Sequence, residues 1–200
     1  MPSDDNTVNI NSRTGRYHHG DLRAALIEHG LAELALRPPD EVSLREIARR
    51  AGVSATAVYR HFPDKAALLG ALCQVGGAQL SEAFRTAMAK TEGGKAAFSA
   101  MGRAYVRFAL ANPSLFRLIM THPPPPDGAP EQVQKAWDRR LDMVATALDG
   151  LMPADSPPEI RRVRQLQAWS LVHGLAMLML DGQVPADDSL IDQVIEANFV

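Results

Sequence analysis

Residues 43–69 read SLREIARRAGVSATAVYRHFPDKAALL, and this stretch decides the fold. Ser43 followed three residues later by Glu46 is a capping box, in which each side chain satisfies an unpaired amide at a helix start. The pattern predicts a helix over 44–51. Gly52 is expected to end that helix, because glycine adopts the left-handed C-cap conformation at little cost. The stretch therefore opens with a short helix and a tight turn.

A second short helix follows the turn, with Ser54 as its expected cap and an end near Arg60. Small and apolar residues would let the two helices approach closely at a fixed angle. These residues are Ile47, Ala48, Ala51, Val53 and Val58. The second helix then faces outward, and its outward side is small, hydroxylic, aromatic and basic, which suits the major groove of DNA. That side consists of Ser54, Ala55, Thr56, Tyr59 and Arg60.

The rest of the chain also predicts helices. Apolar residues recur every three or four positions, and no stretch alternates over six residues as a half-buried strand would. Proline and glycine mark the helix ends, and Pro63 suits the first position of a long helix. The expected helices run over about 21–34, 44–51, 54–60, 63–89, 95–111, 113–121, 129–151, 157–181 and 187–198.

Composition is that of an ordinary globular protein, with 46% hydrophobic and 22% charged residues. No apolar run approaches the roughly 18–20 residues of a membrane span, and residues 1–12 lack the features of a signal peptide. We therefore expect a cytoplasmic protein without membrane contact and with a disordered lead-in over 1–12. The net charge of -2 does not suggest nucleic acid by itself, so that inference depends on the motif.

No cofactor or metal site is expected. Cys73 is the only cysteine, and its simplest interpretation is a small buried apolar side chain. His18 and His19 lie near Asp21, yet adjacent histidines at a helix start point apart, which disfavours a shared metal ion. The sequence also shows no nucleophile with a base, no paired carboxylates in an apolar setting and no phosphate-cradling glycine loop. An enzyme is therefore not expected.

Residues 43–69 resemble the helix-turn-helix of TetR-family regulators. YHHGDLR at 17–23 resembles the opening of one subgroup of that family, and AWSLVHG at 168–174 resembles the tryptophan, histidine and glycine of its C-terminal domain. The sequence departs from the commoner family pattern at RPPDEV, residues 37–42, where a glycine-led loop often stands. This departure leaves the angle of the first helix open.

The resemblance implies an all-α fold with two domains. An N-terminal three-helix, helix-turn-helix DNA-binding domain would occupy 13–66. A C-terminal helical domain for effector binding and dimerisation would occupy 67–200. The function implied is that of a sequence-specific, DNA-binding transcriptional regulator, expected to be a repressor released by a small, largely apolar effector. The alternatives are a ligand-dependent activator and a non-specific architectural DNA-binding protein.

The resemblance also implies which residues bind DNA besides the outward side of the second helix. Arg16 and Tyr17 would reach an adjacent groove, Ser43 and Arg45 would meet the backbone, and His61 and Lys65 would hold phosphates. Lys65 would lie in the first turn of a helix, where its charge opposes the helix dipole, so a phosphate is a plausible partner. A solvated Lys65 and a core-packed Tyr59 ring are the alternatives, and Arg49 and Arg50 are interpreted as solvated.

Aromatic and methionine residues recur at helical spacing in the C-terminal half. Such faces usually fill a core, while the corresponding region of TetR-like proteins holds an inducer pocket. The candidate effector-binding residues are Met101, Tyr105, Phe108, Phe116, Met120, Trp137, Trp169, His173 and Met177. His173 could donate to a ligand, but a satisfied structural histidine is the favoured interpretation.

The last two helices are expected to form a homodimer interface. The segment 171–180 is apolar nearly all round, so it must be covered on two sides. The final helix adds an apolar stripe of Leu190, Ile191, Val194 and Ile195, and the pair resembles the four-helix dimer interface of the family. A two-fold dimer would place its recognition helices about 34–36 Å apart and would read an inverted-repeat operator in double-stranded DNA.

Overall fold

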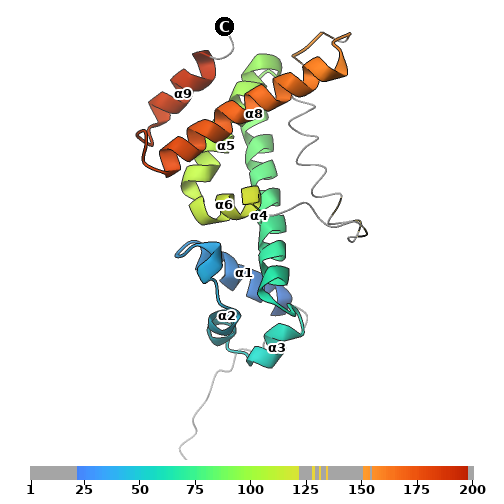
Figure 1. Ribbon diagram of the computed structural model, residues 1–200, viewed down its shortest axis with the longest axis vertical. Coiled ribbons are helices and arrows are strands. Elements are labelled where there is room, and N and C mark those ends of the chain that lie inside the picture. The colour runs from blue at the N-terminus through green and yellow to red at the C-terminus, as the bar shows by residue number, and fades with distance from the viewer. Residues whose placement is uncertain are drawn as a thin grey trace, which may run out of the picture.

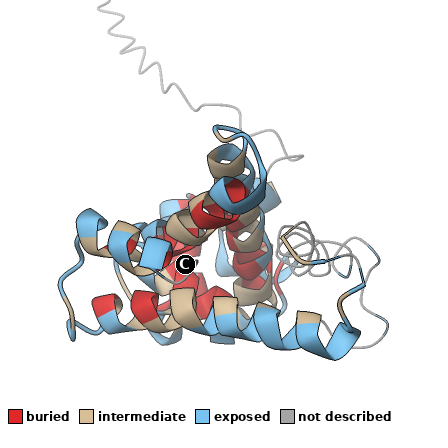
Figure 2. Ribbon diagram, turned by 90° about the horizontal axis from the view of Figure 1, so that it is seen from above, coloured by how far each residue is buried: buried red, intermediate tan, exposed pale blue. Residues whose placement is uncertain are grey.

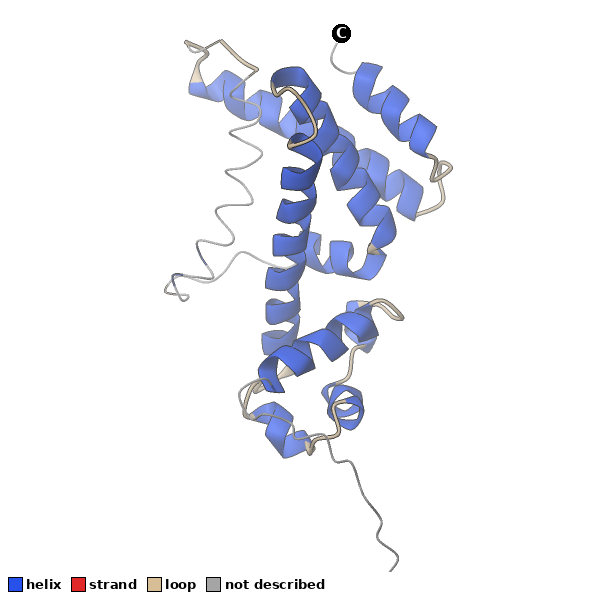
Figure 3. Ribbon diagram, turned by 180° about the vertical axis from the view of Figure 1, so that it is seen from behind, coloured by secondary structure: helices blue, strands red, loops and turns tan. Residues whose placement is uncertain are grey.

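A computed structural model of the protein describes residues 22–121 and 155–197, together with 128, 131, 134 and 151–153. Within these residues the regular structure is entirely helical, which confirms the predicted all-α class (Figures 1 and 3). The elements are α1 (Leu22–Leu34), the short 3-10 helix η1 (Pro39–Glu41), α2 (Leu44–Arg50), α3 (Ala55–Tyr59), α4 (Lys65–Met88), α5 (Gly94–Ala111), α6 (Pro113–Thr121), α8 (Pro158–Leu180) and α9 (Asp188–Ala197). Among the described helices, none has the length and apolar character needed to cross a bilayer.

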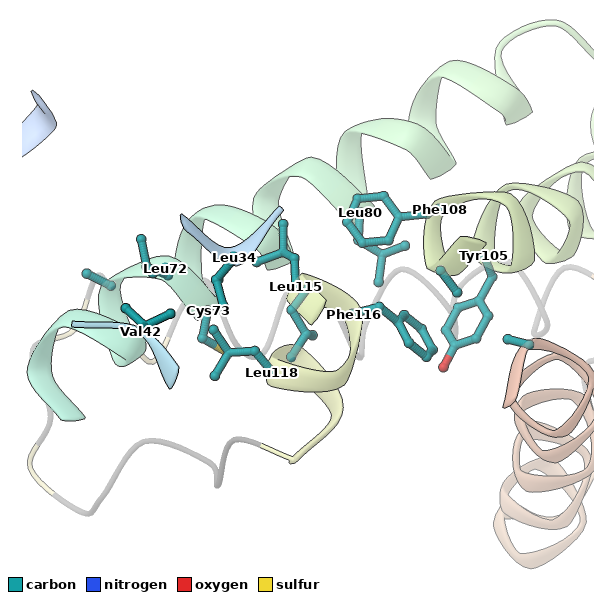
Figure 4. Close-up of a cluster of buried hydrophobic side chains, with 14 of the residues drawn as sticks. Leu34, Val42, Leu72, Cys73, Leu80, Tyr105, Phe108, Leu115, Phe116 and Leu118 are labelled. Carbon is teal, nitrogen blue, oxygen red and sulfur yellow. The ribbon is translucent and has the colours of Figure 1, made fainter. Parts of the chain in front are cut away.

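The long helix α4 connects two groups of helices. The short helices α1 to α3 gather at its N-terminal end, and α5, α6, α8 and α9 lie around its C-terminal half (Figure 1). Buried residues line the inward faces of these helices (Figure 2). They form one continuous apolar cluster that follows α4 from Val42 and Leu72 to Phe116 (Figure 4). The predicted domain boundary at 66/67 falls in the first turn of α4.

The predicted caps of the two short helices are present. Ser43 Oγ accepts a hydrogen bond from the amide of Glu46 at 3.5 Å, and Ser54 Oγ accepts one from the amide of Ala57 at 3.2 Å. The reciprocal half of the capping box is not formed, because the carboxylate of Glu46 accepts hydrogen bonds from Arg49 and Arg50 instead. The sequence pattern was therefore right about the helix start and wrong about the partner of Glu46.

The start of α4 lies two residues later than predicted. Pro63 does not begin the helix, since Asp64 is its cap and accepts a hydrogen bond from the amide of Ala67 at 2.7 Å. An aspartate side chain can satisfy an amide of the first turn, and this interaction places the first helical residue at Lys65. Asp21 and most of the helix predicted over 129–151 lie outside the described residues.

A buried carboxylate joins α1 to α2. Glu33 is fully buried, and its oxygens lie 3.0 Å from Arg37 Nε and 2.7 Å from Arg50 Nη2. These are ion-pair separations, although the Glu33 oxygens and Arg37 Nε do not meet hydrogen-bond geometry. Removing either arginine would leave buried negative charge less compensated, which is costly in an apolar interior. Arg50 is therefore a structural residue and not the solvated one that was expected.

A series of ion pairs connects α9 to α5. Arg103 binds Asp192 at 2.7 Å and Glu196 at 2.6 Å, while Arg107 binds Asp188 at 2.7 Å. The acidic residues recur every four positions and therefore share one face of α9. Ile191 and Ile195, the buried residues of α9, pack into the core. Apolar packing and charge together hold the last helix in place.

The helices α4 and α6 approach closely at Gly76. An added Cβ at this position would lie 2.7 Å from Leu115 Cδ1 and 2.8 Å from Ile119 Cδ1, both on α6. The neighbouring Gly77 has open space where its Cβ would be. Only Gly76 is therefore required by packing, and the absence of its side chain lets α6 rest against the middle of α4.

We expect Gly76→Ala to lower the free energy of unfolding by about 1–3 kcal/mol, because the added methyl group overpacks the contact with α6. Gly77→Ala serves as the matched control, and it should raise stability by up to about 1 kcal/mol through helix propensity alone. Urea unfolding followed by circular dichroism would measure both. Equal stabilisation by the two substitutions would contradict this account of the α4–α6 contact.

Candidate DNA-binding surface and effector site

The turn between α2 and α3 is built on Gly52. This residue has a φ of 66°, a left-handed conformation that other residues adopt only with strain. The amide of Gly52 donates to the carbonyl of Arg49 at 3.2 Å, and the amide of Val53 donates to the carbonyl of Ala48 at 3.0 Å. These two bonds form a Schellman motif, which ends α2 and sets the direction in which the chain leaves it.

The underside of α3 is buried, and its outer side is exposed. Val58 is 1% exposed and packs in the same apolar cluster as Ile47 of α2. The predicted DNA-contacting residues from the cap of α3 onward are all exposed. They are Ser54, Ala55, Thr56, Tyr59, Arg60 and His61. The Tyr59 side chain is 46% exposed, so its ring is not a core residue and is available to a partner.

Three further residues that were predicted to contact DNA lie near α3. Arg45 is exposed in the first turn of α2, and the Ser43 hydroxyl that caps α2 can still donate its hydrogen. Lys65 is half-buried, and its ammonium donates a hydrogen bond to the backbone carbonyl of Asp40 in η1. This internal partner accounts for the position of the lysine without a phosphate, and its other two N–H donors remain for one. Arg16 and Tyr17 lie outside the described residues.

Carboxylates inside the helix-turn-helix neutralise part of its positive charge. Hydrogen bonds from Arg49 and Arg50 hold the pKa of Glu46 well below its usual range, at about 2. Arg49 donates to both carboxylate oxygens of Glu46, at 2.9 and 2.6 Å. Both arginines are therefore ion-paired, but the Arg49 side chain remains 73% exposed, as the solvated interpretation expects, and only Arg50 departs from that interpretation.

The candidate effector residues meet at the hydroxyl of Tyr105. Its oxygen lies 3.0 Å from His173 Nδ1 and 3.3 Å from Met120 Sδ, and it accepts a hydrogen bond from Trp169 Nε1 at 3.3 Å. The ring of Phe116 lies edge-on to Tyr105, with centroids 5.4 Å apart, and 5.9 Å from the ring of His173. Residues of α5, α6 and α8 thus form one aromatic cluster.

Two neighbours of the Tyr105 hydroxyl, Met120 Sδ and His173 Nδ1, can each accept its hydrogen. A hydroxyl has one hydrogen and two lone pairs, an indole N–H can only donate, and a thioether sulfur can only accept. Either Met120 Sδ or an unprotonated His173 Nδ1 can accept that one hydrogen, so both tautomers of the neutral imidazole fit these contacts. His173 Nε2 has no hydrogen-bond partner among the residues that the structure describes. Burial lowers the pKa of His173, which favours the neutral ring.

Burial divides the candidate effector residues into two sets. Met101, Tyr105, Phe108 and Phe116 are buried and belong to the core, as the simpler interpretation holds. Met120, His173 and Met177 are half-buried, and Trp169 is 49% exposed at the edge of the cluster. Trp137 lies outside the described residues. The edge residues are the ones that a ligand could reach without displacing the core.

Comparison with known proteins identifies the family from both ends of the chain. Residues 26–72 match the bacterial regulatory proteins of the tetR family, and residues 98–198 match the tetracyclin repressor-like C-terminal domain. The chain belongs to the TetR family. It is a DNA-binding transcriptional regulator, and α2, the Gly52 turn and α3 are its helix-turn-helix.

Solved structures resemble this TetR-family chain along most of its length. A protein of unknown function from Rhodococcus sp. RHA1 is 34% identical, with a TM-score of 0.75 over 92% of this chain and 94% of that one. A tetR-family transcriptional regulator from Streptomyces coelicolor is 26% identical, with a TM-score of 0.64 over 89% of this chain and 78% of that one. A TetR-family transcriptional regulator from Bordetella parapertussis 12822, at 19% identity and a TM-score of 0.59 over 88% and 93%, supports the fold alone.

Sequence reasoning missed several partners in this TetR-family protein. No local pattern indicates that Glu33 is buried against Arg50, or that Lys65 donates to a carbonyl 25 residues away. The contact between Tyr105 and His173 joins residues 68 positions apart. Lys65, Tyr105 and His173 stood out in the sequence and Glu33 did not, and the partner of each was decided by the packing of the helices.

The lowered pKa of His173 predicts a pH-dependent stability. The unfolded chain takes up a proton near the ordinary value of 6.5, whereas the folded protein resists it. The stability is therefore complete above this value and is lost as the pH falls toward the lowered pKa. Between about pH 7.5 and 5, the Tm should fall more steeply for the wild type than for His173→Gln. Parallel Tm curves for the two proteins would contradict the role given to burial.

Proposed function

We propose that this TetR-family regulator is a dimeric repressor that binds an inverted-repeat operator and is released by a small, largely apolar effector. The observation that carries the proposal is the position of α6. This helix contributes to the aromatic cluster at one face and packs against α4, the helix that follows the helix-turn-helix, at another.

Neighbouring residues of α6 connect the two sites. Phe116 contacts Tyr105 and His173, and Met120 Sδ lies 3.3 Å from the Tyr105 hydroxyl oxygen. The adjacent Leu115 and Ile119 face Gly76 of α4. A ligand that displaces the half-buried edge of the aromatic cluster would therefore push on α6, and the tight contact at Gly76 would pass the displacement to α4.

Helix α6 also packs against α1 and η1. Since η1 holds the ammonium of Lys65 through the carbonyl of Asp40, a shift of α6 acts on the start of α4 as well as on its middle. In a dimer, a change in the angle of α4 would alter the spacing of the two recognition helices and weaken operator binding. This coupling supports release by an effector.

One face of α8 supports dimerisation. Leu171, Gly174 and Leu178 recur at spacings of three and four and therefore share a side of the helix. The Leu178 side chain is 47% exposed, and an added Cβ at Gly174 would meet nothing within 4 Å. Because a small residue between the half-buried Leu171 and the exposed Leu178 allows close approach of another helix, a second copy of the chain fits this face.

We expect Leu178→Glu to convert the dimer to a monomer, because the substitution places charge in an apolar helix contact. Leu36→Glu is the matched control, since Leu36 is 68% exposed in the connection between α1 and η1. Sedimentation velocity would measure the oligomeric state, and circular dichroism would verify the fold. A wild-type protein that is monomeric at micromolar concentration would refute the dimer.

Selection from a random duplex pool at about 150 mM salt would test operator binding. The proposal expects an inverted repeat, bound about a thousandfold or more tightly than scrambled DNA. Equal affinity for all duplexes would indicate the non-specific architectural protein instead. Activation and repression would be distinguished by placing the recovered operator within or upstream of a reporter promoter and measuring transcription.

Thr56→Ala should weaken operator binding by about 1–3 kcal/mol and affect scrambled DNA less, because Thr56 is on the exposed side of the recognition helix. Thr86→Ala removes the same groups from an exposed position on α4, where the hydroxyl bonds Glu82, and should leave DNA binding unchanged. Fluorescence anisotropy with labelled duplexes would measure both. Equal losses for the two variants would argue against base contact by Thr56.

A further inference from the structure

The arginines of α1 to α3 and their connections fall into two sets. Arg37, Arg49 and Arg50 form ion pairs with Glu33 or Glu46. Arg23, Arg45 and Arg60 are exposed and have no ion-pair partner within the described part of the chain. The second set carries the positive charge that the protein leaves available to a partner. Arg45 and Arg60 belong to the helix-turn-helix, whereas Arg23 is on the first turn of α1.

Arg23 is held beside the end of the recognition helix. Its guanidinium carbon lies over the ring of Phe62, 5.3 Å from the ring centroid. Phe62 is 2% exposed, so the ring is a fixed part of the core. It directly follows Arg60 and His61, both exposed. The contact therefore places a charge from α1 close to the charges that follow α3.

A guanidinium placed over a ring in this way suits the binding of an oxyanion. A guanidinium that stacks on a ring uses its flat face, and its N–H groups point outward in the plane of the group. Those donors match the spacing of two oxygens of a phosphate. Because the ring already restricts the side chain, less conformational entropy is lost when Arg23 binds than for a freely moving arginine. The chemistry is that of a pre-ordered phosphate contact.

We propose that Arg23 binds a phosphate of the DNA backbone next to the groove that α3 occupies. The contact extends the DNA-binding surface from the helix-turn-helix to α1, and it is independent of base sequence. This inference rests on the proposed operator binding only for the position of the duplex. The Arg23 contact orients the protein on the duplex and increases its affinity for DNA. The exposed side of α3 determines the sequence preference.

The salt dependence of DNA binding tests this role. Each phosphate contact contributes about 0.9 to the slope of log affinity against log salt, so Arg23→Gln should reduce the slope by about 1.8 for a dimer. The affinity should fall by a similar factor for the selected operator and for scrambled DNA. Arg23→Lys keeps the charge and should retain most of the slope. Anisotropy titrations at several KCl concentrations would provide these values.

Arg85→Gln is the matched control. It removes the same charge from α4, where Arg85 is exposed near the helix end and paired with Glu82, and it should leave the slope unchanged. Circular dichroism and Tm would verify that each variant folds. A lower Tm for Arg23→Gln with an unchanged slope would show that the arginine only covers Phe62, and it would overturn the proposal.

The outcomes separate this inference from the proposed function. A wild-type protein that binds all duplexes equally would refute the operator, yet the slope of non-specific binding would still reveal the Arg23 contact. A wild-type protein that selects an operator, with a slope that Arg23→Gln does not change, would refute the Arg23 contact alone. A fall in affinity confined to the operator would also overturn it, because a phosphate contact does not discriminate sequence.

Discussion

The close contact between α4 and α6 at Gly76 constrains the rest of the molecule. A glycine without a side chain lets Leu115 and Ile119 reach the backbone of α4, so the two helices cannot move independently without opening a void. The same α4 packs against α1 through Leu72, which meets Gly30 at a second close approach. The helix-turn-helix and the aromatic cluster therefore share one packed helix and not a flexible linker.

Ion pairs connect the helices of the DNA-binding end, and arginines without ion-pair partners among the described residues lie on its surface. Glu33 and Glu46 form ion pairs with Arg37, Arg49 and Arg50, and the buried Glu33 joins α1 to α2. Arg45 and Arg60 are left exposed beside Thr56 and the other outward residues of α3. The net charge of the chain is -2, so its affinity for DNA depends on this local arrangement and not on the overall balance.

The aromatic cluster has a structural part and an accessible edge, to which the proposed effector would bind. Tyr105 and Phe116 are buried and hold α5 against α6, whereas His173 and Trp169 reach the edge of the cluster from α8. The contact of Nδ1 with the Tyr105 hydroxyl orients the histidine ring and leaves Nε2 without a partner among the described residues. An oriented imidazole at the edge of an apolar cluster would suit an apolar ligand that carries one polar group.

The sequence by itself determined the helical class, the helix-turn-helix and its exposed face. These depend on local interactions: the hydroxyls of Ser43 and Ser54 bond amides three residues away, and Gly52 adopts a conformation that suits few other residues. Only the tertiary structure decided that Lys65 bonds Asp40, that Arg50 pairs with buried Glu33 and that Tyr105 meets His173. Those contacts join residues on different helices or connections. Their partners are chosen by how the helices pack, and no short-range spacing encodes that choice.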